Sequence, residues 1–154
     1  MDFFSPAELD IAVKLLVATG LGLLVGTERV FARKTAGMRT YALTALGSAL
    51  FVIIAQEVVK DFSGLTNYDP LRMAAQVVSA LGFLCAGIVF LRDSRVTGLT
   101  TAAGVWVTGG IGMAAGYGLF FIAVISALIT FFVFSVLWSL EHKIKKASGV
   151  WEKE

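Results

Sequence analysis

The sequence predicts an all-α membrane protein with five transmembrane helices. Of its 154 residues, 57% are hydrophobic and only 16% are charged, whereas a soluble domain is about a quarter charged. Five apolar segments approach the ~20 residues that are needed to cross ~30 Å of hydrocarbon. These segments lack the alternation of apolar and polar residues that is typical of barrel strands. There is too little polar sequence to cover a soluble globule, so we expect a helical bundle in a membrane.

Two helix starts carry clear sequence signals. Ser5 as N-cap, Pro6 at the first helical position and Glu8 at the third predict a capping box. Asp69 followed by Pro70 predicts a second capped start. We assign residues 1–142 to the five-helix membrane domain and residues 143–154 to a short charged tail. The predicted helices run from about Pro6 to Val30, Arg39 to Val59, Asp69 to Leu91, Thr100 to Tyr117 and Leu119 to Leu140.

The distribution of lysine and arginine predicts the orientation. Ten of the thirteen basic residues fall in the first loop, the third loop and the C-terminal tail, which lie on one side if there are five spans. The positive-inside rule then places the N-terminus outside and the C-terminus inside. The N-terminal acids Asp2, Glu8 and Asp10 do not fit a cleaved signal peptide, so we expect the first segment to be retained.

Two basic turns resemble each other. GTERVFARKTAGMRT runs from Gly26 to Thr40, and GIVFLRDSRVTGLTT runs from Gly87 to Thr101, 61 residues later. The match predicts a duplicated hairpin, in which helices one and two correspond to helices three and four as a parallel repeat. The alternative is chance similarity between two glycine-rich apolar segments.

Small residues at four-residue spacing predict close helix packing. Such residues lie along one helix face and let backbones approach in lipid. We expect helices one and four to form the packed interior, with a glycine-lined ligand groove as the minor alternative. The two rows are Ala18, Gly22 and Gly26 in helix one, and Gly104, Thr108, Gly112 and Gly116 in helix four.

The first turn contains the strongest candidates for a polar site. Glu28 and Arg29 lie where helix one ends, and an ionised group at the hydrocarbon boundary is costly unless it is paired or snorkels. Arg39 begins helix two and opposes the positive end of its dipole. We therefore expect an ion pair of Glu28 with Arg29 or Arg39, or a partner for Arg39 in Asp93, a phosphate or a lipid headgroup. An ordinary positive-inside loop is the alternative.

The second turn, Arg92-Asp93-Ser94-Arg95, reads most simply as a solvated loop. The threonines that follow it are predicted to cap helix four. With the free N–H groups of the helix start, three hydroxyls could instead hold an anion. These threonines are Thr97, Thr100 and Thr101.

Several classes of function are not predicted. One histidine and one cysteine exclude a disulfide and a Cys/His metal site within a single chain. No catalytic set, nucleotide loop, metal site or cofactor site is found, and a net charge of +2 does not suggest nucleic acid. The middle of every predicted helix lacks an ionisable residue, which argues against proton- or cation-coupled transport. Trp106 is expected to pack inside helix four.

At these residues the sequence resembles the MgtC/SapB family of bacterial inner-membrane proteins. The resemblance covers about residues 9 to 140 and rests on GLLVGTERVFARKTAGMRTYALTALGSALF and GFLCAGIVFLRDSRVTGLTTAAGVWVTGGIGMAAG. It makes Gly37 and Gly98 signature positions and implies a functional role for the two turns. The functional candidates are Glu28, Arg29, Arg39, Thr40, Asp93, Arg95, Thr100 and Thr101.

The resemblance implies a multi-pass protein linked to growth at low magnesium and, in pathogens, to virulence through survival in macrophages. It also implies action on partners, among them the membrane part of the F-type ATP synthase, and ties to phosphate physiology or phosphatase activity. The member that gives the family its name carries a soluble C-terminal domain, whereas this sequence stops at Glu154, so the resemblance does not extend to functions that need that domain. The sequence is that of either a short family member or a piece of a longer one. We expect a non-enzymatic modulator in contact with membrane lipid, and its small-residue faces are compatible with a homodimer. The alternatives are a carrier or channel for magnesium, phosphate or protons and, last, a phosphatase.

Overall fold

The computed structural model describes residues 5–61, 69, 71–92, 95–138, 140 and 143–144, and it is mostly helical. One short antiparallel hairpin pairs Phe90 with Thr97 and Arg92 with Arg95. The elements in chain order are α1 (Pro6–Phe31), α2 (Met38–Asp61), α3 (Leu71–Ala86), β1 (Phe90–Arg92), β2 (Arg95–Thr97), α4 (Leu99–Gly116), α5 (Phe120–Phe132) and the π-helical η1 (Val133–Leu137).

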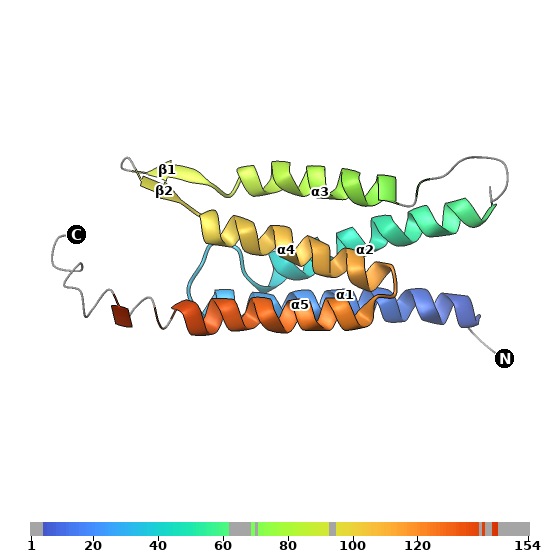
Figure 1. Ribbon diagram of the computed structural model, residues 1–154, viewed down its shortest axis with the longest axis horizontal. Helices are drawn as coiled ribbons and strands as arrows, with labels where there is room; N and C mark the ends of the chain where they lie inside the picture. The colour runs from blue at the N-terminus through green and yellow to red at the C-terminus, as the bar shows by residue number, and fades with distance from the viewer. Residues whose placement is uncertain are drawn as a thin grey trace.

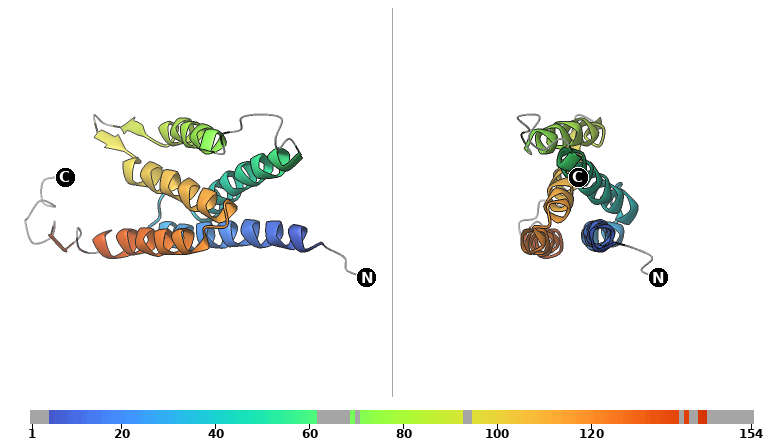
Figure 2. Two further views of the ribbon diagram at one scale, coloured as in Figure 1. Left: turned by 45° about the vertical axis from the view of Figure 1, so that its right-hand side comes forward. Right: turned by 90° about the vertical axis from the view of Figure 1, so that its right-hand side faces the viewer.

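The helices form an elongated bundle in three layers. Seen from the end, α2 and α4 lie between α3 on one side and α1 with α5 on the other (Figure 2). The described N-terminal end of α1 is at one end of the bundle, and the β hairpin lies at the other (Figure 1). The most extensive helix contacts are those of α2 with α1 and with α4, so α2 is the central element of the bundle.

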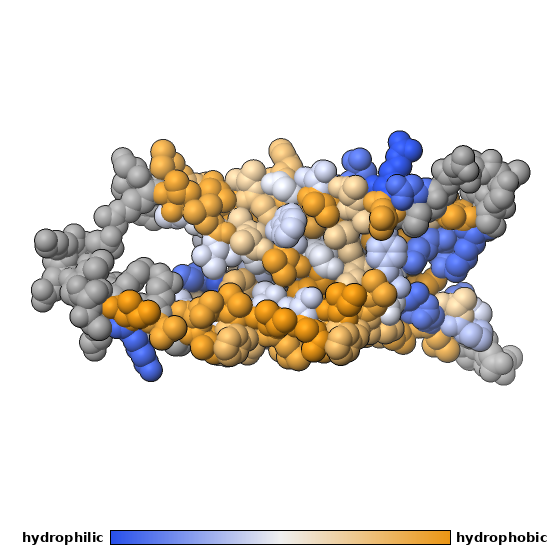
Figure 3. All heavy atoms as spheres, viewed as in Figure 1, coloured by the Kyte–Doolittle hydropathy of each residue, from blue (hydrophilic) through white to orange (hydrophobic). Residues whose placement is uncertain are grey.

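Among the described residues, three segments are long and apolar enough to cross a membrane: Pro6–Phe31, Met38–Lys60 and Phe120–Leu137. The helix α3 is apolar but has only 16 residues, and α4 has 18 residues, of which several are glycine or threonine. On the face shown in Figure 3, apolar side chains cover much of the middle, whereas hydrophilic side chains gather towards the ends. This distribution is that of a membrane protein.

The helix starts follow the capping signals in the sequence. The backbone N–H of Glu8 donates to the Ser5 hydroxyl, and the Glu8 carboxylate accepts from the Ser5 N–H, so the capping box is complete. The Asp69 carboxylate accepts a hydrogen bond of 2.9 Å from the N–H of Leu71 at the start of α3. Polar side chains therefore satisfy N–H groups that have no partner within the helix.

The third helix is shorter than predicted. It ends at Ala86 rather than near Leu91, because the chain turns at Gly87 and Ile88 and enters β1. The hairpin β1–β2 satisfies the backbone groups of this segment through strand pairing. The apolar residues Phe90 and Leu91 thus belong to an exposed strand, where hydrophobicity alone suggests the end of a span.

The predicted threonine cap of α4 is also wrong. The N-cap is Gly98, whose φ of 88° is left-handed, and no side chain caps the helix. A Cβ at this position would lie 2.2 Å from the carbonyl oxygen of Ile88, so only glycine fits here. The Thr97 hydroxyl instead donates to the carbonyl of Phe90 across the hairpin.

The two rows of small residues lie against α2. A Cβ on Gly22 of α1 would come within 2.9 Å of Ala45, and one on Gly112 of α4 would lie 2.2 Å from the Ala45 carbonyl oxygen. Gly116 lies in the same way against Ala49. The backbones of α1, α2 and α4 thus touch directly. The row members that the structure buries are Ala18, Gly22, Gly26, Gly104, Thr108, Gly112 and Gly116.

Candidate functional site

An arginine–carboxylate pair is buried where α1 ends. The Arg29 side chain is 2% exposed, and Glu28, its neighbour in the chain, is 8% exposed. The Arg29 guanidinium forms an ion pair with the Glu28 carboxylate and also donates from Nε to the same oxygen. The sequence left two ion pairs possible for Glu28, one with Arg29 and one with Arg39. The structure contains the pair of Glu28 with Arg29. Removing either partner would leave a buried charge without its counter-ion.

Two aromatic side chains enclose this pair. The Arg29 guanidinium carbon lies 3.5 Å from the ring centroid of Phe134, in a cation–π contact. The Phe134 ring also meets Tyr41 of α2 edge to face, with centroids 6.4 Å apart. The Tyr41 hydroxyl donates to the carbonyl of Thr101 at 3.3 Å, which connects α2 to the start of α4. The buried cluster therefore consists of Glu28, Arg29, Tyr41, Thr101 and Phe134.

Sequence reasoning missed Tyr41 and Phe134. Both lie in apolar helices that contain other aromatic residues, and one-dimensional spacing does not identify which ring meets Arg29. The only hint in the sequence is Gly104, a member of the small-residue row in α4. In the structure a Cβ at Gly104 would lie 2.3 Å from Phe134 and 2.6 Å from the Tyr41 hydroxyl, so the glycine makes room for both rings. Trp106 of α4, expected to be a packing residue, is 49% exposed and lines a hollow together with Val78 and Leu81 of α3.

The other arginine of the first turn lies differently. Arg39 is exposed in the first turn of α2 and forms no ion pair with any residue that the structure describes. Asp93, its suggested partner, lies outside the described residues. For Arg95 the backbone is described, within β2. Thr40 accepts on its carbonyl from the Thr44 hydroxyl, and Thr100 is exposed.

We predict opposite outcomes for lysine at these two arginines. Arg29→Lys removes the planar group that stacks on Phe134 and should lower the free energy of unfolding in detergent by about 2 kcal/mol. Arg39→Lys keeps the charge of an exposed side chain and should change the free energy of unfolding by less than about 0.5 kcal/mol. Detergent-denaturation midpoints of the two variants measure the difference. Equal midpoints would contradict the assignment of Arg29 to the buried site.

A cavity of about 400 Å³ lies where the two basic turns meet. The first turn contributes Arg33, Lys34 and Thr35 to its lining, and the second turn contributes residues between Ile88 and Thr101. Its polar lining from the second turn comprises Thr97, Thr100 and Thr101, next to the N-terminus of α4. The two segments that resemble each other in sequence therefore face one another across a single space.

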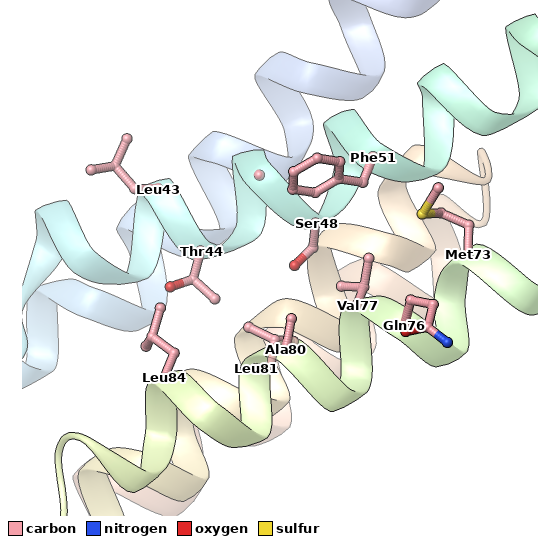
Figure 4. A pocket seen from close by; sticks show the side chains of 11 residues that line it. Leu43, Thr44, Ser48, Phe51, Met73, Gln76, Val77, Ala80, Leu81 and Leu84 are labelled. Carbon is pink, nitrogen blue, oxygen red and sulfur yellow. The ribbon is translucent and has the colours of Figure 1, made fainter.

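A second cavity lies on the outer side of the bundle, between α2 and α3. Its volume is about 360 Å³, and its lining is mostly apolar, with Thr44, Ser48 and Gln76 as the polar members. Thr44 and Ser48 of α2 point towards α3 across this groove (Figure 4). No side chain in its lining carries a charge, so it differs chemically from the cavity at the turns.

Known proteins were compared with the whole chain. The family model described as MgtC family matches residues 15–143. The chain belongs to the MgtC family. No solved structure matches the chain.

Relatives extend beyond the matched segment. The chain is 36% identical over 137 residues to the protein named "Putative magnesium transporter YhiD" of Escherichia coli K12, covering 88% of this chain and 64% of that protein. It is 40% identical over 117 residues to Protein MgtC of Salmonella typhimurium 14028s, covering 76% of this chain and 48% of that protein. The chain thus spans about half to two thirds of the length of these MgtC-family relatives.

Proposed function

We propose that this MgtC-family chain is a non-enzymatic membrane protein that modulates other membrane proteins by direct contact. The observation that supports this most is the direct packing of α1, α2 and α4. At Gly22, Gly112 and Gly116 there is no space even for a methyl group between the helices. A solute path between these three helices would require them to separate.

The charges of the described helices support the same proposal. The ion pair of Asp10 and Lys14, with 2.6 Å between its atoms, lies near the start of α1, and Glu28 with Arg29 lies near its end. In α2 the charged residues likewise lie near the two ends. Transport pathways usually contain an ionisable side chain within the membrane. The described helices place none in their middle turns.

A carrier or channel is the second candidate, and the cavity between the basic turns is the observation that favours it. The name of the Escherichia coli relative points to magnesium. Magnesium prefers oxygen ligands, chiefly carboxylates. Among the described residues, however, no three histidine, cysteine, aspartate or glutamate side chains come together, and the cavity lining there contributes cations. We therefore rank modulation above magnesium transport.

We also propose that all five helices span the bacterial inner membrane, with the N-terminus outside and both basic turns in the cytoplasm. The two turns lie at the same end of the bundle, away from the described N-terminal end (Figure 1). The duplicated hairpin is supported by the helix starts, because α2 begins at Met38 and α4 begins 61 residues later at Leu99. By contrast α1 continues through Glu28, whereas α3 ends before the matching position.

Site-specific photocrosslinking tests the modulator proposal. A crosslinker at Ala80, in the groove between α2 and α3, or at Ile122 on α5 should give discrete protein adducts in native membranes. Tagging the identified partner should then recover this chain in return. If both positions yield only lipid adducts at native expression levels, contact with another membrane protein is not how the chain acts.

A further inference from the structure

We propose that the cavity between the two basic turns binds a phosphoryl group, supplied by free phosphate or by a phospholipid headgroup. The proposal does not depend on whether the chain modulates or transports. It rests on three properties of the cavity: its positive charge, its neutral hydrogen-bond donors, and the hydroxyl of the largely buried Thr101, which bonds to no described residue.

The positive charge comes from the end of α1. Arg33 and Lys34 line the cavity, and neither has an acidic partner among the described residues. The N–H of Arg33 donates to the Val30 carbonyl, and that of Lys34 donates to the Arg29 carbonyl, so α1 ends in a Schellman motif. Arg33 has a left-handed φ of 52°, a position that favours glycine. The turn places two neighbouring, exposed cationic residues in the cavity lining.

Neutral donors come from α4. The first bond of this helix joins the N–H of Ala102 to the carbonyl of Gly98, so the N–H groups of the preceding residues have no partner within the helix. Thr100 and Thr101 add hydroxyl donors to the same lining, whereas the Thr97 hydroxyl already donates to the Phe90 carbonyl. No described residue of the lining is acidic. Together these groups favour an anion with several oxygens.

The independent observation is the side chain of Thr101. This residue is 4% exposed and lines the cavity, yet its hydroxyl forms no hydrogen bond with any described residue. Thr108, one further buried threonine of α4, donates to the Gly104 carbonyl at 2.8 Å. Among the described residues no fully enclosed side-chain oxygen or nitrogen lacks a partner, so the Thr101 oxygen keeps access to the cavity, where a group from outside the chain can bond to it. An anion oxygen in the cavity would be such a group.

The lining suits a phosphoryl group better than a metal cation. Two positive side chains and a helix N-terminus repel a cation and attract an oxyanion. A tetrahedral group can accept hydrogen bonds from the two turns at once. The cavity, at about 400 Å³, also leaves room for a substituent on one oxygen, such as the glycerol of a phospholipid. Free phosphate and a lipid headgroup therefore share the same recognition chemistry here.

Phosphate binding to the complete chain in phosphatidylcholine nanodiscs tests the site. Inorganic phosphate is titrated and followed by phosphorus NMR line width, and Thr101→Val should weaken binding about tenfold. Thr108→Val is the matched control, because it makes the same change at a buried threonine whose hydroxyl is already satisfied. Its affinity should equal that of the unmodified chain.

A second set of measurements tests the role of the positive charge of Arg33 and Lys34. It also distinguishes free phosphate from a phospholipid headgroup as the source of the phosphoryl group. Arg33→Asn with Lys34→Gln should abolish measurable binding, whereas Lys143→Gln, which removes a positive charge outside the cavity lining, should not. Phosphatidylglycerol retained by the purified protein, and lost in Thr101→Val, would assign the headgroup as the source; titratable phosphate would assign the free ion. Absence of both ligands, or equal binding by Thr101→Val, would overturn the proposal.

Discussion

Gly112→Ala is expected to lower the free energy of unfolding by about 1–3 kcal/mol or more. The added methyl would lie 2.2 Å from the carbonyl oxygen of Ala45 and 2.7 Å from its Cα. These atoms belong to the backbone of α2, so no side-chain rotation relieves the clash, and α2 and α4 must separate. Denaturant titration in mixed micelles measures the loss.

Gly110→Ala is the matched control in the same helix. A Cβ at this position meets no atom within 4 Å, so the substitution should leave the unfolding free energy unchanged or raise it slightly. On α1 the pair Gly22→Ala and Gly20→Ala repeats the test, because a Cβ clashes with α2 only at Gly22. If the members of each pair behave alike, the packing of α2 between α1 and α4 is wrong.

Glu28→Leu is expected to destabilise the protein by about 3–5 kcal/mol, because it leaves the buried Arg29 guanidinium without a counter-charge. Adding Arg29→Met should recover most of the loss, since the charge is removed and a methionine sulfur can pack against the ring of Phe134. The double variant is thus predicted to be more stable than the Glu28→Leu single variant. The denaturation midpoints of Glu28→Leu, Arg29→Met and the double variant, compared with that of the unmodified protein, form a double-mutant cycle.

The ion pair of the exposed Asp10 with the partly buried Lys14 is the control for this cycle. Asp10→Asn removes an exposed acidic partner from an ion pair of the same helix, and it should cost less than about 1 kcal/mol. Equal losses in Glu28→Leu and Asp10→Asn would show that the Glu28–Arg29 pair is not buried in the folded protein.

The sequence predicted the helix starts better than the helix ends. A capping box is a local pattern, so Ser5 and Glu8 were sufficient to place the first residue of α1. The end of α3 depends on whether Phe90 and Leu91 continue a span or pair with β2, and both states accept apolar residues. The cap at Gly98 depends on the nearby Ile88 carbonyl, a contact that is formed only in the folded chain.

The polar site was predictable only in part. The sequence identified Glu28 and Arg29 as costly charges at the end of a span, but it left two pairings open because Arg39 lies close along the chain. The roles of Phe134 and Tyr41 come from helices that are distant in sequence and meet at Arg29. That the two turns share one cavity likewise follows from the packing of α1 and α4 on α2.

Ion flux in proteoliposomes tests the central claim most directly, because a bundle with directly packed helices should not conduct. We predict that gradients of magnesium, phosphate and protons decay no faster than in protein-free liposomes, with ionophores verifying that each gradient is measurable. Phosphate should still bind under these conditions. Flux of any of the three that scales with the amount of protein and changes in Gly112→Ala would contradict the account and establish a transporter.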